Sequence, residues 1–136
     1  MTTSSQPRHF REWEIWLVEW QHEDGSYKAR PALVVTSEAY NDNHPHVLFA
    51  QIRSKPPVGG NSWWHFHPGD PSFASTRLKK ECYLHPRIQA IEKNRIIALP
   101  GRLNVFLTFT VKREIQISLG RDVPLDQDGI PESFTS

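Results

Sequence analysis

The sequence predicts a mainly β domain, a small antiparallel β-barrel with one α-helix packed on it near the C-terminus. Three observations support this fold class. Short apolar segments alternate with turn residues over most of the chain, as in small all-β domains. The hydrophobic period then changes to that of a helix near residue 105. The length of 136 residues suits a single domain.

The first two strands form a hairpin. The segment EWEIWLVEW at 12–20 is rich in aromatic and β-branched residues, and apolar residues occupy both of its alternating sets. We therefore expect a strand that is partly buried on both faces. Asp24-Gly25 is the turn dipeptide of a hairpin. RPALVVT at 30–36 is the returning strand, with Pro31 confined to its first residues.

A polar loop at 37–46 separates this hairpin from the later strands. These are expected at 47–53, 62–67, 81–91 and 96–103, and the third of them is weaker because Pro86 interrupts it. The residues 92–95 are expected to form one helical turn.

The final element is a helix over 105–119, where apolar residues recur near helical spacing. Asn104 is suited to cap its start, and Gly120 occupies the position of a C-cap glycine. The acidic tail at 121–136 has little to bury, so we expect it to be disordered. The expected organisation is an N-terminal extension at 1–10, one domain at 11–120 and this tail.

Composition favours a soluble, cytoplasmic protein. The single cysteine, Cys82, excludes an internal disulfide framework. The first ten residues lack the apolar centre of a signal peptide, and no apolar run approaches the length of a membrane span. The net charge is +1, but between residues 77 and 113 nine Lys/Arg face only two acidic residues. Such a basic half suits an anionic partner such as nucleic acid, although charge alone favours ordinary solvated loops.

Four segments carry a resemblance to a known family. EIWLVEW, RPALVVTSEAYND and VLFAQIRS resemble the opening of the MazF/PemK bacterial toxins, which begin with a GDIWLVDF-like strand followed by RPALVVS and YN. YLHPRIQAIEKNRI is similar to the family segment L-x-x-I-R-T-I-D-K-x-R-I, and GRLN…QISLG to its GRLS turn and closing helix. The resemblance covers residues 12–120.

This resemblance implies an SH3-like antiparallel β-barrel of the MazF/CcdB type that usually forms a homodimer. Members are toxins that an antitoxin protein neutralises, and most cleave single-stranded RNA at short sequences without a metal or other cofactor. Some relatives that share the fold poison DNA gyrase instead, so the fold does not settle the target.

Metal-free RNA cleavage uses the 2′-OH of the substrate as nucleophile. It needs a base for that proton, a donor for the leaving 5′-oxygen and positive charge at the phosphate. Arg30 in KARPALVV matches the catalytic arginine of the family, and a guanidinium matches two phosphate oxygens. Without the resemblance, Arg30 would be read as an arginine that pairs with a surface carboxylate.

The end of the third strand departs from the family pattern. The family places a catalytic threonine in P-I-T-S, whereas the same positions read Q-I-R-S here, with Arg53 followed by Ser54. Either Arg30 and Arg53 clamp a phosphate while Ser54 supplies the hydroxyl, or catalysis is lost and only binding survives. Some members carry an acidic residue on the fifth strand where this chain has Pro86, and the neighbouring His85 is a candidate proton acceptor.

Further residues are candidates for contacts with nucleic acid. The basic ones are Lys28, Lys55, Arg77, Lys79, Lys80 and Arg87. Trp63 and Trp64 could stack on unpaired bases, unless Trp64 and Phe66, or Trp63 alone, fill the core. The i, i+2 histidine pairs in HPH and HFH have no accompanying cysteine pair or H-E-x-x-H helix, so we expect no metal site.

The predicted function is a toxin that cleaves single-stranded RNA, with an antitoxin and a second copy of the chain as partners. Two alternatives remain open: an inactive family member that binds nucleic acid or protein through the same cleft, and an inhibitor directed at gyrase.

Overall fold

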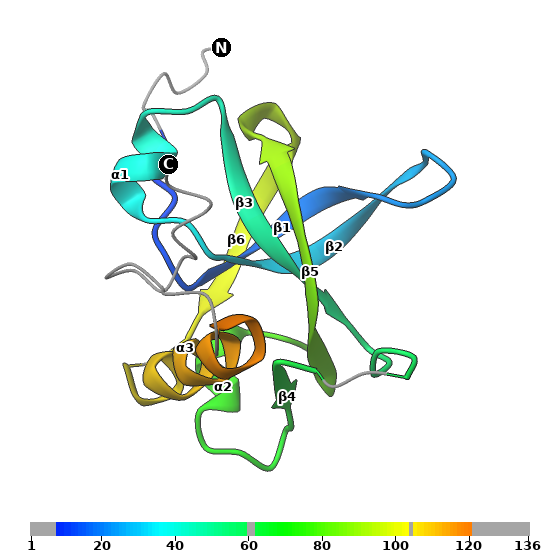
Figure 1. Cartoon of the computed structure of the whole chain (residues 1–136), viewed down its shortest axis with the longest axis vertical. Coiled ribbons are helices and arrows are strands. Elements are labelled where there is room, and N and C mark those ends of the chain that lie inside the picture. Colours follow the sequence, from blue (N-terminus) through cyan, green and yellow to red (C-terminus); the bar gives the residue numbers. More distant parts are fainter. Residues whose placement is uncertain (1–7, 60–61, 104, 121–136) are drawn as a thin grey trace.

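The computed structural model describes residues 8–59, 62–103 and 105–120. Within these residues, six strands, three α-helices and a 3₁₀ turn follow one another (Figure 1). They are β1 (Glu14–Gln21), β2 (Tyr27–Val34), α1 (Glu38–Asp42), β3 (His46–Arg53), β4 (Trp64–Phe66), α2 (Phe73–Thr76), β5 (Cys82–Glu92), η1 (Lys93–Arg95), β6 (Ile96–Arg102) and α3 (Val105–Gly120).

The strands form one antiparallel sheet in the order β4-β5-β3-β2-β1-β6. The mainly β fold with a C-terminal helix is therefore confirmed. The sheet is not closed, because β4 and β6 remain its two edges in the described part of the chain. Figure 1 shows α2, α3 and β4 together at one end of the molecule, α1 towards the other end, and the β1–β2 hairpin extending to one side.

Alternate residues of the central strands fill two apolar cores, because successive side chains of a strand point to opposite faces. On β3, Ala50 and Ile52 pack in the core that includes α3, whereas Val47 and Phe49 pack in the other core. β1 also serves both cores, which confirms its predicted burial on two faces. It gives Ile15 to the first core and Trp16, Val18 and Trp20 to the second.

β5 runs without interruption through Pro86, so the predicted break in this strand is wrong. On β3, Ala50 pairs with Ile88 and Ile52 pairs with Leu84, so a step of two residues on β3 matches a step of four on β5. Pro86 lies in this bulge, where the ladder does not require the N–H that proline lacks.

Two short helices lie where the sequence predicted only loops. α1 begins after Ser37, whose side chain accepts a hydrogen bond from the backbone N–H of Tyr40. α2 packs against β6 at Gly101. A Cβ at Gly101 would lie 2.2 Å from the carbonyl oxygen of Thr76, so this approach requires glycine. The predicted turn over 92–95 is confirmed as η1.

Two residues at the predicted ends of the domain, Phe10 and Gly120, have defined places in the structure. Phe10, assigned to the N-terminal extension, is buried, and its carbonyl accepts a hydrogen bond from the side-chain amide of Asn41. Gly120 is the last residue of α3 rather than the residue after it, and Asn104 and the tail at 121–136 lie outside the described residues.

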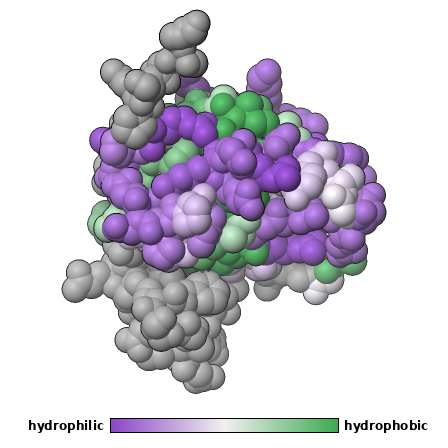
Figure 2. Space-filling view, turned by 90° about the horizontal axis from the view of Figure 1, so that it is seen from above, coloured by the Kyte–Doolittle hydropathy of each residue, from purple (hydrophilic) through white to green (hydrophobic). Residues whose placement is uncertain are grey.

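The outer surface is mostly polar on the side shown in Figure 2, which looks down on the molecule of Figure 1 from above. Hydrophilic side chains cover most of it, with hydrophobic patches between them. Among the described residues, no helix combines the length and hydrophobicity needed to cross a membrane.

Candidate nucleic-acid interface

A small cleft opens where β2 and β3 separate. Their pairing ends at Ala32–Gln51, and continuing that register by two residues places Arg30 opposite Arg53. Beyond this point β3 pairs with β5 on its other side, at Arg53–Tyr83. This cleft has a volume of about 310 Å³ and is the smaller of the two clefts described below. It is lined by Arg30, Pro31, Ile52, Arg53, Ser54, Lys55, Lys80 and Cys82.

The smaller cleft is strongly cationic. Of the described side chains that line it, four are basic and none is acidic. These four cations (Arg30, Arg53, Lys55 and Lys80) form no ion pair with any described residue. Arg30 is half-buried and the other three are exposed, so their charges converge on a space that an anion can enter. Three of the predicted catalytic residues, Arg30, Arg53 and Ser54, are thus brought together.

His85 lies behind this cleft rather than in its lining. Its side chain is buried, and Nε2 lies 2.7 Å from the carbonyl oxygen of Lys55. Because a carbonyl only accepts, Nε2 carries the proton and donates it. In this structure His85 therefore holds the backbone of the loop that presents Ser54 and Lys55.

Cys82 forms part of the floor of the smaller cleft. It is buried, and its thiol donates a hydrogen bond to the carbonyl oxygen of Lys80 at 3.2 Å. Burial raises the pKa of the Cys82 thiol above its ordinary value, although the nearby Lys80 opposes this shift. Cys82 is consequently a neutral floor residue at physiological pH.

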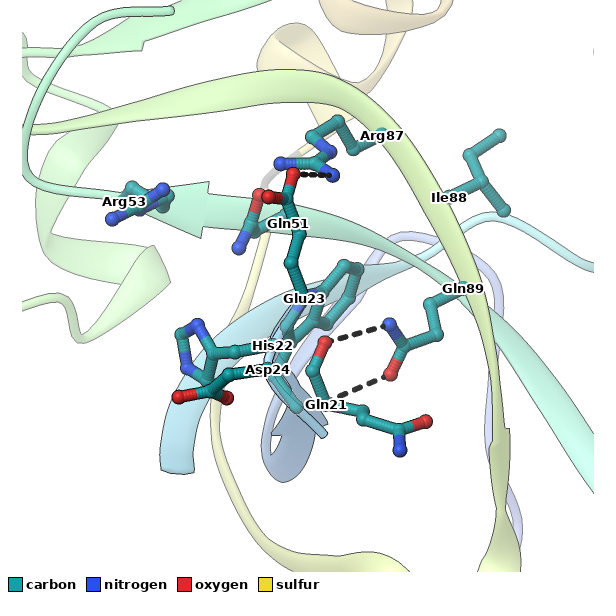
Figure 3. A pocket seen from close by; sticks show the side chains of 10 residues that line it. Gln21, His22, Glu23, Asp24, Gln51, Arg53, Arg87, Ile88 and Gln89 are labelled. Carbon is teal, nitrogen blue, oxygen red and sulfur yellow. Dashed lines mark hydrogen bonds and ion pairs between the residues drawn. The ribbon is translucent and has the colours of Figure 1, made fainter. Parts of the chain in front are cut away.

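A larger cleft of about 640 Å³ lies beside the first, between the β1–β2 hairpin and the strands β3 and β5. Its lining residues are Trp20, Gln21, His22, Glu23, Asp24, Gln51, Arg53, Arg87, Ile88 and Gln89 (Figure 3). Arg53 lines both clefts, so it marks the place where they adjoin.

The hairpin is attached to β5 across the larger cleft. The backbone N–H of Gln21 donates to Oε1 of Gln89 at 3.0 Å, and Nε2 of Gln89 donates to the carbonyl of Gln21 at 3.2 Å. Glu23 and Arg87 add an exposed ion pair at 3.4 Å, and Figure 3 shows these two side chains pointing toward each other. At the hairpin tip, hydrogen bonds from the hydroxyl and amide of Ser26 lower the pKa of Asp24.

Two residues that line the larger cleft each carry a buried polar atom with no partner in the described part of the chain. Gln51 is 2% exposed, and no hydrogen-bond donor among the described residues reaches its Oε1. Nε2 of His22 is likewise buried and unpaired within the described chain. Neither residue was predicted from the sequence as part of a site. The available signal was Gln51 itself, which stands where the family pattern has proline.

The other residues predicted to contact nucleic acid differ in whether they line a cleft and in how exposed they are. Arg87 lines the larger cleft, whereas three exposed cations (Lys28, Arg77 and Lys79) line neither cleft. Trp63 is buried in the core at 3% exposure, so its ring has no free face for a base, and its assignment to the binding surface is corrected. Trp64 is half-buried and packs against the same core, as does the fully buried Phe66.

Metal-ligating side chains gather away from both clefts. His9, Glu38 and Asp42 place ligand atoms within 4.8 Å of one another, but they lie near the surface, and Arg11 also approaches Glu38 at 3.6 Å. The HPH and HFH histidines have other contacts: His46 bonds the hydroxyl of Tyr40, and His65 bonds Glu81.

Comparison with known structures supports the fold. The structure superposes on the Mycobacterium tuberculosis toxin MazF-mt6 with a TM-score of 0.61 at 20% identity, covering 80% of this chain and 98% of the other. MazF from Deinococcus radiodurans gives a TM-score of 0.61 at 14% identity, with coverages of 84% and 99%. A mycobacterial endoribonuclease in complex with its cognate antitoxin gives 0.60 at 14% identity, with coverages of 84% and 98%.

Sequence comparison identifies the family directly. No curated protein sequence matches the chain significantly. The family profile described as PemK-like, MazF-like toxin of type II toxin–antitoxin system matches residues 11–119, which span β1 to α3 and both clefts. The chain therefore belongs to the PemK-like, MazF-like toxins of type II toxin–antitoxin systems.

Proposed function

We propose that this chain is an endoribonuclease that cleaves single-stranded RNA in the smaller cleft, without a metal ion. The observation that carries the proposal is the convergence of Arg30, Arg53, Lys55 and Lys80 around Ser54, in a cleft where no described residue contributes a carboxylate. Such a set of unpaired cations matches a phosphodiester whose negative charge increases in the transition state.

The reaction is an internal transesterification. The substrate 2′-oxygen forms a bond to phosphorus while the bond from phosphorus to the 5′-oxygen breaks, which leaves a 2′,3′-cyclic phosphate and a 5′-OH. Arg30 and Arg53 flank the phosphate and stabilise its added charge through planar N–H donors. The hydroxyl of Ser54 donates a further hydrogen bond to a non-bridging oxygen.

No described residue lining the smaller cleft is a ready proton acceptor at neutral pH. Arginine and lysine are charged, the thiol of Cys82 is neutral, and His85 does not line the cleft. The proton of the 2′-OH therefore passes to solvent, and solvent returns a proton to the 5′-oxygen. His85 acts as a positioning residue for the loop in this proposal.

The direct test is cleavage of single-stranded RNA in EDTA, with detection of 2′,3′-cyclic phosphate ends. We expect Arg30→Ala to lower the cleavage rate by about 10²- to 10³-fold, the range for loss of one preorganised donor. Arg77→Ala is the matched control, since Arg77 is an exposed arginine outside both clefts. Failure of the wild-type protein to cleave diverse RNAs would overturn the proposal.

The pH profile separates solvent from histidine as proton acceptor. With solvent as acceptor, the rate rises steadily with pH from 5 to 8, whereas a histidine base produces a plateau above its pKa, ordinarily about 6.5. A plateau that disappears in His85→Gln would restore His85 to a catalytic role.

The absence of a ready base also favours a second candidate, a family member that binds RNA without cutting it. In that case the smaller cleft retains its affinity for phosphate, and Arg53 contributes binding alone. RNA binding by the wild type together with an absence of cleavage would identify this second function.

We also propose a homodimer and an antitoxin as partners. Exposed apolar residues support an interface: Ile97 and Leu99 lie on the edge strand β6, and Phe109 and Ile117 lie on α3. Light scattering of the purified chain, compared with Leu99→Glu and Phe109→Glu variants, tests the dimer. A wild-type protein that remains monomeric at micromolar concentration would contradict it. A cytoplasmic location remains a prediction.

A further inference from the structure

We propose that the larger cleft binds the nucleobase next to the scissile phosphate, and that Gln51 selects adenine there. This inference rests on the proposed function, because it treats the two clefts as neighbouring parts of one RNA site. It assigns to Gln51 a role in specificity rather than in catalysis.

The first argument is the position of Gln51 on its strand. Val47, Phe49 and Gln51 alternate along one face of β3, and the first two fill the apolar core. The pattern calls for a third apolar residue, yet an amide is buried there at 2% exposure. A buried acceptor without a partner destabilises the fold, so an apolar side chain would serve folding better.

The two residues that carry these unpaired atoms line a space large enough for a base. Oε1 of Gln51 comes from β3 and Nε2 of His22 comes from the end of the hairpin, and both residues line the larger cleft. Ile88 and Trp20 supply apolar surface beside them. A planar ring with polar edges fits such a combination.

The charge of the lining argues against a second phosphate in this cleft. Glu23 and Asp24 oppose Arg87 and Arg53, and Arg87 is already paired with Glu23. The described lining of the smaller cleft contains no acidic side chain. A neutral ligand that forms hydrogen bonds therefore suits the larger cleft, while the phosphate suits the smaller one.

Arg53 links the two sites, since it lines both clefts. A phosphate bound at Arg53 leaves the attached nucleoside beside Gln51, two residues earlier on the same face of β3. Glutamine pairs with adenine by accepting from the exocyclic amino group and donating to N7. The unsatisfied Oε1 is the atom that requires such a donor.

The test uses the four nucleoside 5′-monophosphates as probes, because they share one phosphate and differ only in the base. Titration of ¹⁵N-labelled protein should shift the Gln51 side-chain amide resonance most strongly with AMP. We expect AMP to bind about tenfold or more tighter than UMP, as one bidentate base contact provides. Gln51→Leu should abolish this preference and retain the phosphate-dependent shifts of the smaller cleft.

Two controls keep the result interpretable. Gln116→Leu replaces an exposed glutamine on α3, which lines neither cleft, and should keep the AMP preference. The melting temperature of Gln51→Leu should equal or exceed that of the wild type, because the substitution removes an unsatisfied acceptor. A marked fall in the melting temperature of both Gln51→Leu and Gln51→Met would show that the amide supports the fold, and would overturn the proposal.

Equal affinity for the four nucleotides would also overturn the proposal. Resonance shifts confined to the smaller cleft would do the same. The latter result is expected if a protein segment of the antitoxin is the true occupant. Because nucleotide binding is measured without turnover, an AMP preference in a chain that cleaves no RNA would refute the nuclease and leave the adenine preference of Gln51 standing. Cleavage of RNA with no preference for adenine beside the cut would support the nuclease and refute the role of Gln51.

Discussion

The two clefts share Arg53 but differ in their chemistry. The smaller cleft gathers basic side chains that have no ion-pair partner in the described chain, whereas the larger one mixes charges of both signs with amides. The difference suggests a division of labour in which one cleft holds charge and the other distinguishes neutral groups. Phosphate contacts position a nucleic acid, and contacts to bases specify its sequence.

The structural origins of the clefts also differ. The smaller cleft results from local geometry, since β2 and β3 separate after Ala32–Gln51. The larger cleft depends on the hydrogen bonds of Gln21 with Gln89 and on the exposed Glu23–Arg87 pair. Exposed ion pairs contribute little to stability. The hairpin that forms one side of the larger cleft should therefore move away more easily than the strands that form the smaller cleft.

Substitution of Arg53 should have the largest effect, because it damages both clefts. We expect Arg53→Ala to lower RNA affinity by about tenfold or more, since hydrogen bonds to charged groups contribute about 1.5–3 kcal/mol. Loss of a donor to the transition state should lower the cleavage rate by a further ~10²-fold. The measurements are equilibrium binding and single-turnover cleavage of the same RNA.

The comparison with Arg30→Ala shows whether Arg53 really serves both sites. Arg30 lines only the smaller cleft, so Arg30→Ala should preserve the AMP preference measured at Gln51. Arg53→Ala should weaken AMP binding as well as cleavage. Identical behaviour of the two variants in both assays would mean that the clefts are not separate sites.

The salt dependence of RNA binding should report the smaller cleft. For single strands, each phosphate contact contributes about 0.7 to the slope of log K against log salt. The double variant Lys55→Ala, Lys80→Ala should therefore lose about 1.4 of this slope. The matched control removes Lys28 and Lys79, which are exposed but line neither cleft, and an equal loss there would show that RNA binds over a broad basic surface.

The smaller cleft was largely predictable from sequence, and the larger one was not. Arg53 and Ser54 lie at the end of β3, and Arg30 lies on β2 just beyond its last pair with β3. Their approach therefore follows from pairing between strands that are neighbours in the chain. The larger cleft requires Gln21 to meet Gln89, 68 residues away, which no local pattern encodes. Likewise, Pro86 looked like a break because the bulge that accommodates it depends on the register with β3.

Removal of the Glu23–Arg87 ion pair should raise RNA affinity, and by less than the cleft substitutions above lower it. Glu23→Gln frees Arg87 for phosphate and removes one negative charge from the larger cleft, so RNA affinity should rise by up to about fivefold, the limit for an exposed pair. Glu19→Gln is a close control, because Glu19 pairs with Arg95 at the same 3.4 Å but lines neither cleft. An equal gain in RNA affinity in both variants would mean that the gain comes from the change in net charge and not from the release of Arg87.

The smallest expected effect concerns the reactivity of the thiol in the floor of the smaller cleft. Cys82 is 5% exposed, and burial raises the pKa of its thiol, so less thiolate is present at pH 8 than in the unfolded chain. Alkylation by iodoacetamide should therefore be slower than in denaturant and should accelerate as the pH rises through 9. The chain has a single cysteine, so mass spectrometry follows this one reaction.

Ligands should then separate the two clefts by their effect on Cys82. A single-stranded RNA that occupies the smaller cleft should slow alkylation by a further few-fold, because Cys82 lines the same cleft as Arg30 and Lys80. Adenosine, which lacks the phosphate, should bind only beside Gln51 and leave the alkylation rate unchanged. Protection by adenosine as strong as that by RNA would place the base over Cys82, and would mean that phosphate and base do not occupy separate clefts.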